Sequence, residues 1–366
     1  MFLTALYCIL IAVLLVQFIY YLFFFTLPFN TKRNGTLIVE NKAISIIIYI
    51  KNNANELKQN LPSIINQEYK DFEIVLVNHS SSDQSLEIIK HFQQNHHHIK
   101  VVNVENKEAF WGNKKYALTL GIKAASNDSL LFFNIDCKPA SKLWIKEMAS
   151  KLDKETSVVI GYKSLKSTKF SVKSLFIRFH NTLSSLKFFT FAKLNNPYKG
   201  FQENFGYNRQ LFFKVKGFIN HINIVNGETD LFLKDSKAVA KTQIQLIPDS
   251  YVKEQSIVTF SEFLSDFRKH NALRSFYSGK TRFFLALFNL SKFMFWLSSI
   301  YLCFHNLIFG LLAIAIYLLF QYAFITKAMV KLKEVKLLYF LPILDISYVF
   351  FVFFSAILNL VSKPKL

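Results

Sequence analysis

Residues 44–83 read ISIIIYIKNNANELKQNLPSIINQEYKDFEIVLVNHSSSD, and their pattern indicates the fold class. The β-branched run over 44–50 indicates a strand that is buried on both faces. Apolar residues then recur on one face of a helix over about 54–67, and a second apolar run follows at 72–77. Because strand and helix alternate at this spacing, the stretch predicts a mostly parallel α/β sheet with right-handed crossovers.

The same alternation continues downstream. It predicts a helix capped by Asp83, a strand at 99–104, a helix at 113–125, a strand at 130–133 and a helix capped by Ser141. In open α/β sheets, ligands bind beyond the carboxyl ends of the strands. The polar residues at those ends are therefore candidates for a site, and they fall at 51–53, 78–83 and 134–138.

The N-terminal segment is uncharged from residue 1 to residue 31 and nearly all apolar over 2–27. About 20 apolar residues are enough to span a bilayer as a helix. The segment lacks the positive start and the small-residue cleavage site of a signal peptide. It therefore predicts an uncleaved transmembrane anchor over residues 1–30.

The C-terminal third predicts two or three further membrane helices within 285–361. Two uninterrupted candidates are 285–304 and 307–325, and a third at 338–361 contains Pro342 and Asp345. The third segment either crosses the membrane or re-enters it.

Positive residues near the membrane ends predict the orientation. Lys and Arg concentrate on the cytoplasmic side of membrane proteins, and here they flank the middle of the chain at Lys32, Arg33, Arg274, Lys280 and Arg282. The sequence thus predicts an integral protein of the cell membrane with a cytoplasmic middle domain.

The net charge limits the classes of partner, and the cysteine spacing indicates the redox compartment. The formal net charge is +20, which favours contact with anionic membrane lipid and with an anionic substrate. No nucleic-acid recognition motif accompanies the charge, so no nucleic-acid partner is expected. The three cysteines are far apart and form neither a disulfide framework nor a zinc-binding spacing, as is usual in a reducing cytosol.

Three further stretches carry a family resemblance. They are GNKKYALTLGIKAASNDSLLFFNIDCKPASKLWIKEM at 112–148, GYNRQLFFKVKGF at 206–218 and NGETDLFLK at 226–234. Together with 44–83 they resemble membrane-bound family 2 glycosyltransferases, which are inverting enzymes with the type A fold. The resemblance implies a nucleotide-diphospho-sugar transferase domain over 40–265 and an interfacial basic segment over 266–284.

The resemblance also implies a divalent metal. The family places Asp-x-Asp at a strand end, where its carboxylates hold a metal beside the donor's diphosphate. This chain has Asn134-Ile135-Asp136, so an amide replaces the first carboxylate. Asp136 is the expected ligand of Mg²⁺ or Mn²⁺, with Asn134 beside the donor; the alternative is that Asp136 only caps a turn or helix.

Further donor-binding candidates match the family less closely. Lys114 or Lys115 corresponds to a lysine near the diphosphate, although a helical lysine often only faces water. At the base-binding corner, Asn53 and His79 stand where the family has carboxylates. The remaining substrate-binding candidates are Asn78, Asp83, Asn204, Arg268 and His270.

An inverting transfer needs a general base for the acceptor hydroxyl. The family's acidic motif corresponds to Glu228-Thr229-Asp230, where Asp230 is the first choice and Glu228 the second. The alternative is a helix-capping cluster. The three consecutive histidines at 96–98 are not expected to bind metal, because consecutive side chains do not converge.

Two functions fit these residues. The first is an active transferase that moves one sugar from a nucleotide-sugar donor to a lipid-linked or polysaccharide acceptor, since three C-terminal spans are few for a polymer channel. The second is a catalytically degenerate relative that acts as a membrane binding or scaffold protein, given the departures at Asn53, His79 and Asn134. The joint presence of Asp136, Glu228 and Asp230 favours the first.

Overall fold

The computed structural model describes residues 2–29, 42–105, 113–152, 158–166 and 171–361 of the 366-residue chain. These form two compact units. The sheet unit contains residues 32–168 and 191–259, and the membrane unit contains residues 1–31, 169–190 and 260–365.

The sheet unit is built on a seven-stranded sheet with the order β3-β2-β1-β4-β8-β6-β9. Strands β3, β2, β1 and β4 run parallel to one another, as do β6 and β9, and β8 runs antiparallel to its neighbours β4 and β6. This confirms the mostly parallel sheet predicted from the sequence. The strand bounds are β1 Ile44–Ile50, β2 Phe72–His79, β3 Ile99–Val104, β4 Ser129–Asn134, β6 Val158–Gly161, β8 Phe205–Asn208 and β9 Thr242–Gln245.

A second, three-stranded sheet adjoins the end of β4. It pairs β10 (Val252–Glu254) with β5 (Cys137–Pro139) and with β7 (Lys163–Ser164). Because β5 follows β4 after only two residues, this small sheet fixes the backbone on the far side of Asp136.

Helices of the sheet unit begin close to where the sequence predicts them. Their bounds are α2 Ala54–Ile65, α3 Ser85–Asn95, α4 Lys114–Ala124, α5 Trp144–Ala149, α7 Arg209–Lys214 and α8 Glu228–Ser236. Asn113 caps α4, because its side-chain oxygen accepts a hydrogen bond from the Tyr116 amide at 3.1 Å. The predicted cap Ser141 is wrong: its hydroxyl accepts from the Leu143 amide instead, and α5 begins only at Trp144.

The core of the sheet unit lies against β1. Ile46 and Ile48 are fully buried, and Ile47 on the opposite face is 1% exposed, as expected of a central strand covered on both sides. Helices α2 and α3 and strands β1, β2 and β4 contribute to one apolar cluster that includes Leu61 and Trp144. A strand covered on both faces has apolar side chains at successive positions, and for this reason the β-branched run at 44–50 indicated a strand.

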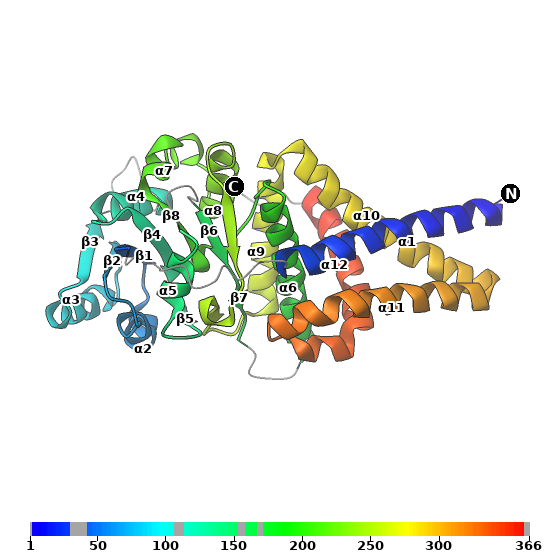
Figure 1. Ribbon diagram of the computed structural model, residues 1–366, viewed down its shortest axis with the longest axis horizontal. Coiled ribbons are helices and arrows are strands. Elements are labelled where there is room, and N and C mark those ends of the chain that lie inside the picture. The colour runs from blue at the N-terminus through cyan, green and yellow to red at the C-terminus, as the bar shows by residue number, and fades with distance from the viewer. Residues whose placement is uncertain (1, 30–41, 106–112, 153–157, 167–170, 362–366) are drawn as a thin grey trace. The chain divides into compact units, whose positions relative to one another are not determined.

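In the membrane unit, three long helices lie side by side: α1 (Phe2–Thr26), α10 (Gly279–His305) and α11 (Leu307–Lys331) (Figure 1). Asn306 ends α10 and caps α11. The shorter α9 (Phe260–Leu273), the part of α6 (Val172–Lys193) up to residue 190, and α12 (Leu341–Val361) complete the unit. Within the described residues, four helical segments are long and apolar enough to cross a membrane, namely Thr4–Phe29, Gly279–His305, Leu307–Lys331 and Val335–Asn359.

A buried polar cluster joins four helices of this unit. The Asp345 carboxylate on α12 pairs with Lys292 on α10. It also accepts hydrogen bonds from Tyr21, Trp296, Tyr317 and Gln321. An ion pair among apolar helices is tolerated when its hydrogen-bonding capacity is satisfied, and here five donors surround one carboxylate.

Candidate active site

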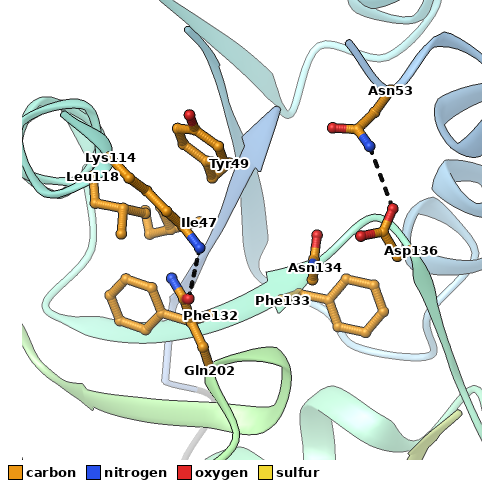
Figure 2. Close-up of a pocket in the computed structure, with 10 residues that line it drawn as sticks. All are labelled: Ile47, Tyr49, Asn53, Lys114, Leu118, Phe132, Phe133, Asn134, Asp136 and Gln202. Carbon is orange, nitrogen blue, oxygen red and sulfur yellow. Dashed lines mark hydrogen bonds between the residues drawn. The ribbon is translucent and has the colours of Figure 1, made fainter. Parts of the chain in front are cut away.

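A pocket opens at the carboxyl ends of β1 and β4, where the sequence predicted a site (Figure 2). It encloses about 170 Å³, below the roughly 300–1,000 Å³ typical of small-molecule sites. Residues 106–112, which lead into α4, lie outside the described residues. The pocket is lined by Ile47, Tyr49, Asn53, Lys114, Leu118, Phe132, Phe133, Asn134, Asp136 and Gln202.

Asp136 lies at the end of β4 with Asn53 opposite. The Asn53 side-chain amide donates a hydrogen bond to the Asp136 carboxylate at 3.3 Å (Figure 2). Burial raises the pKa of Asp136 to about 6, with further contributions from Glu254, Glu56 and Glu203, and Lys163 opposes the shift. The structure thus brings two predicted site residues together and surrounds the carboxylate with negative charge.

These residues fit a divalent metal of the magnesium type. Such ions are commonly held by one or two carboxylates, with substrate phosphates and water completing the coordination. Asp136 offers a carboxylate and Asn134 an amide oxygen at the same strand end (Figure 2). Among the residues that the structure describes, no group of three or more His, Cys, Asp or Glu is placed to hold a metal alone. The donor set therefore suits a metal that is shared with a phosphate ligand.

The two adjacent lysines of α4 have different positions. The Lys114 amine lines the pocket, donates to the Gln202 side-chain oxygen at 2.9 Å, and lies 5.3 Å from the centre of the Tyr49 ring. The Lys115 amine is buried and donates to the backbone carbonyls of Asn226, at 2.7 Å, and Ile224. Lys114 is thus the pocket cation, and Lys115 holds the chain that leads into α8.

The predicted base-binding corner is only partly open to the pocket. His79 is 1% exposed, and its Nδ1 lies 2.9 Å from the hydroxyl of Tyr49. Burial, and secondarily the charge of Glu228, raise the pKa of Tyr49 to about 12. Tyr49, which was not among the predicted site residues, lines the pocket, whereas His79, which was predicted to bind substrate, is buried and does not line it.

Two other candidates at that corner form hydrogen bonds within the fold. Asn78 is buried and its amide donates to the Asn103 side chain at 3.2 Å. The Asp83 carboxylate accepts from the backbone amides of Ala54 and Ser85, each at 3.0 Å. Asp83 thus joins the starts of α2 and α3.

The acidic motif begins α8. Gly227 precedes it in the left-handed backbone conformation, with φ of 77°. Glu228 is 8% exposed and Asp230 is 2% exposed. The charge of Glu228 contributes to the raised pKa of Tyr49 on the pocket wall, but neither Glu228 nor Asp230 is among the residues that line the pocket.

Three remaining candidates lie elsewhere. Asn204 is fully buried, donates to the carbonyls of Tyr162 and Ser250, and accepts from the Trp144 indole. The expectation that Asn204 binds substrate is therefore corrected: its amide is used in the core. Arg268 and His270 belong to α9 in the membrane unit, where Arg268 donates to Asn359 at 3.2 Å, and their substrate contacts stay a prediction.

The pocket thus has a carboxylate and an amide at the end of β4 and a lysine at the start of α4. Residues 45–218 match the family described as glycosyl transferase family 2. The match covers slightly under half of the chain and includes most of the sheet unit, so this part of the chain is similar to family 2 glycosyltransferases.

Similar proteins come from bacteria and archaea. A poly-β-1,6-N-acetyl-D-glucosamine synthase of Staphylococcus epidermidis is 32% identical over 123 residues, covering 32% of this chain and 28% of the synthase. A dolichyl N-acetyl-α-D-glucosaminyl phosphate 3-β-D-2,3-diacetamido-2,3-dideoxy-β-D-glucuronosyltransferase of Methanococcus voltae is 32% identical over 101 residues, covering 26% of this chain and 30% of that enzyme. The chain thus matches under a third of the length of either relative.

One solved structure resembles the chain over most of its length. It is a mannosyltransferase from Pyrobaculum calidifontis in complex with GDP-mannose and Mn²⁺. The TM-score is 0.60 at 15% identity, covering 89% of this chain and 98% of that one. At this identity the likeness establishes the fold alone.

Proposed function

We propose that this chain is a membrane-anchored inverting glycosyltransferase that moves a sugar from a nucleotide-diphosphate donor to a lipid-linked or polysaccharide acceptor. The observation that carries the proposal is the pocket at the ends of β1 and β4. It brings Asp136 and Lys114 to one cavity, and the charge of Glu228 acts on a residue of the same cavity, Tyr49.

Donor binding needs groups that balance the charge of the leaving diphosphate. Asp136 and Asn134 would hold Mg²⁺ or Mn²⁺, which neutralises negative charge on phosphate oxygens when it is bound. Lys114 adds a fixed positive charge at the pocket wall, where Gln202 holds its amine. Asn53 orients the Asp136 carboxylate through its hydrogen bond.

Transfer with inversion needs one carboxylate to take the proton of the acceptor hydroxyl. Asp230 and Glu228 are the candidates. We favour Glu228 over Asp230, because Asp230 is the more deeply buried of the two and the charge of Glu228 contributes to the raised pKa of Tyr49 on the pocket wall. A base in contact with substrate needs access to the pocket.

The acceptor class rests on the relatives and on the membrane helices. One relative is named as a polysaccharide synthase and another as a transferase acting on a dolichyl-linked sugar. Basic residues lie at those ends of the candidate spans that adjoin the sheet unit in the sequence. Their position supports a cytoplasmic site beside membrane lipid. Addition of a single sugar fits the small number of spans.

The test uses the full chain in lipid nanodiscs with Mn²⁺ and a panel of UDP- and GDP-sugars. Release of nucleoside diphosphate is measured for the native chain and for Asp136→Ala, Glu228→Gln and Asp230→Asn. We expect native turnover, loss of turnover in Asp136→Ala, and a greater loss in Glu228→Gln than in Asp230→Asn. Folded native chain that neither turns over nor binds any nucleotide would instead support the degenerate membrane-binding relative.

A further inference from the structure

Behind the pocket, three charged side chains that the proposed chemistry does not use form a cluster, named here the Lys163 cluster. The Lys163 amine on β7 lies 2.8 Å from the Glu203 carboxylate and 3.2 Å from the Glu254 carboxylate on β10. The side chains are 13%, 20% and 9% exposed, in that order. A lysine is thus held between two glutamates in the interior of the sheet unit.

Glu203 connects the cluster to one wall of the pocket. It is the middle residue of a single helical turn, Gln202–Asn204. Gln202 on one side holds the pocket lysine, Lys114, and Asn204 on the other is anchored in the core by Tyr162, Ser250 and Trp144. Fixing Glu203 therefore fixes the position of Gln202 and, through it, the Lys114 amine.

Glu254 connects the cluster to the opposite wall. It pairs with Cys137 across β5 and β10, and the Cys137 thiol donates to its carboxylate at 3.9 Å. The next backbone amide, of Gln255, donates to the Asp136 carbonyl at 2.9 Å. The segment that carries Asp136 is therefore tied to the same lysine.

Stability alone is a weak reason for such a cluster. The desolvation of buried charges commonly offsets their attraction. A protein in which well-packed apolar residues of similar volume replace a buried ion pair is often equally stable. Although burial opposes it, the adjacent glutamates keep the pKa of Lys163 above its usual value, so the lysine stays charged.

We propose that Lys163 is a positioning residue for the transferase site, which sets the separation between the wall that carries Lys114 and Gln202 and the wall that carries Asp136. The proposal rests on the proposed function of the same pocket. The expected ligand of this arrangement is a nucleoside diphosphate together with a divalent cation, because the two walls supply the amine and the carboxylate.

The test measures binding rather than turnover. Lys163→Met alone leaves two buried glutamates without their cation and is expected to misfold in part. The informative variant is therefore Lys163→Met/Glu203→Gln/Glu254→Gln, which removes all three charges. Mn²⁺ affinity is measured by electron paramagnetic resonance, and affinity for UDP and GDP by calorimetry, on full chain in nanodiscs with the melting temperature recorded.

We expect the triple variant to keep a native-like melting temperature and to lose about 10- to 100-fold in affinity for both Mn²⁺ and the nucleoside diphosphate, the range found for residues that support metal ligands. Lys163→Arg should retain most of both affinities. Lys142→Met is the matched control, because Lys142 is an exposed lysine of the same unit, and it should bind as the native chain does.

Two results would overturn the inference. If the folded triple variant bound Mn²⁺ and the nucleoside diphosphate as tightly as the native chain does, the cluster would have no role in positioning the two walls. Weaker Mn²⁺ binding with tighter nucleotide binding would mean that the cluster acts through its net negative charge and not through position. If the native chain itself binds neither probe, the proposed function fails first and the inference fails with it.

Discussion

Lys114 and Lys115 are adjacent in sequence but differ in what their amines contact. The Lys114 amine faces the pocket, whereas the Lys115 amine is bonded to the backbone before α8. On a helix, consecutive side chains point in directions about 100° apart, so one lysine can line a site while its neighbour is buried. Lys114 is therefore expected to bind ligand, and Lys115 is expected to stabilise the fold.

We predict that Lys114→Met weakens donor binding about tenfold or more with little change in stability, since it removes one charge-assisted contact. Lys115→Met should instead lower the free energy of unfolding by about 1–3 kcal/mol, because it leaves the buried carbonyls of Ile224 and Asn226 without a donor. Calorimetric titration and thermal unfolding of both variants check this. Equal losses of affinity in two stable variants would contradict the assignment.

Among the elements, β2 and α4 show how closely the sheet and its helices approach. Gly121 on α4 faces β2, where an added Cβ would lie 2.4 Å from a methyl group of Val77. Ile47 on β1 would be 3.4 Å away. The glycine allows α4 to approach the sheet closely and so places Lys114 at the pocket.

We therefore predict that Gly121→Ala destabilises the chain by about 1–3 kcal/mol, the usual cost of overpacking a core. Val77→Ala combined with it should recover part of that loss, because the clashing methyl group is removed. Thermal or denaturant unfolding of the two single variants and the double variant measures the coupling. Additive losses would show that the two residues do not clash.

Glu73 at the start of β2 links three strands. Its carboxylate accepts from the Ser45 hydroxyl on β1 and from the amide and hydroxyl of Ser126, which precedes β4. Although burial opposes it, these hydrogen bonds and Lys100 lower the pKa of Glu73 below its usual value. The ionised form is therefore favoured in the folded chain.

A lowered carboxyl pKa contributes stability that is present above the unfolded-state pKa of about 4.3 and is lost as the pH falls through the folded pKa. We predict that the native chain loses this contribution below about pH 4, and that Glu73→Gln lacks it at every pH. Unfolding at pH 7 and in the acid range should show a difference between the two chains that shrinks on acidification. A constant difference would exclude this linkage.

At the scale of the whole molecule, one buried carboxylate connects four helices of the membrane unit. Asp345 from α12 receives hydrogen bonds or an ion pair from α1, α10 and α11. We predict that Asp345→Asn, which leaves Lys292 buried without its countercharge, lowers stability by about 3–5 kcal/mol.

The double variant Asp345→Asn/Lys292→Met should recover much of that stability, since both charges are then absent. Melting of the full chain in nanodiscs, followed by intrinsic fluorescence, gives the comparison. A double variant as unstable as the single one would show that the hydrogen bonds to Asp345, and not the charge pair, hold the helices together.

Local sequence patterns were enough to predict the sheet class, the membrane segments and Asp136 as a candidate ligand. Those features depend on local patterns: β-branched runs, helical periodicity, long apolar segments, and a carboxylate directly after a strand. Asn53 and Asp136 were also predictable as neighbours, because the carboxyl ends of adjacent parallel strands meet at one edge of a sheet.

Which polar residues share a site depends on long-range packing and could not be predicted from local patterns. Lys163, Glu203 and Glu254 are separated by 40 or more residues in sequence and meet through β7, β10 and the turn at Gln202–Asn204. Tyr49 was not predicted as a site residue, because it lies within an apolar strand. Asn204 was predicted to bind substrate, because the sequence does not distinguish an amide buried in the core from one that binds a ligand. Side-chain direction and long-range pairing are set by packing, and neither is present in a local pattern.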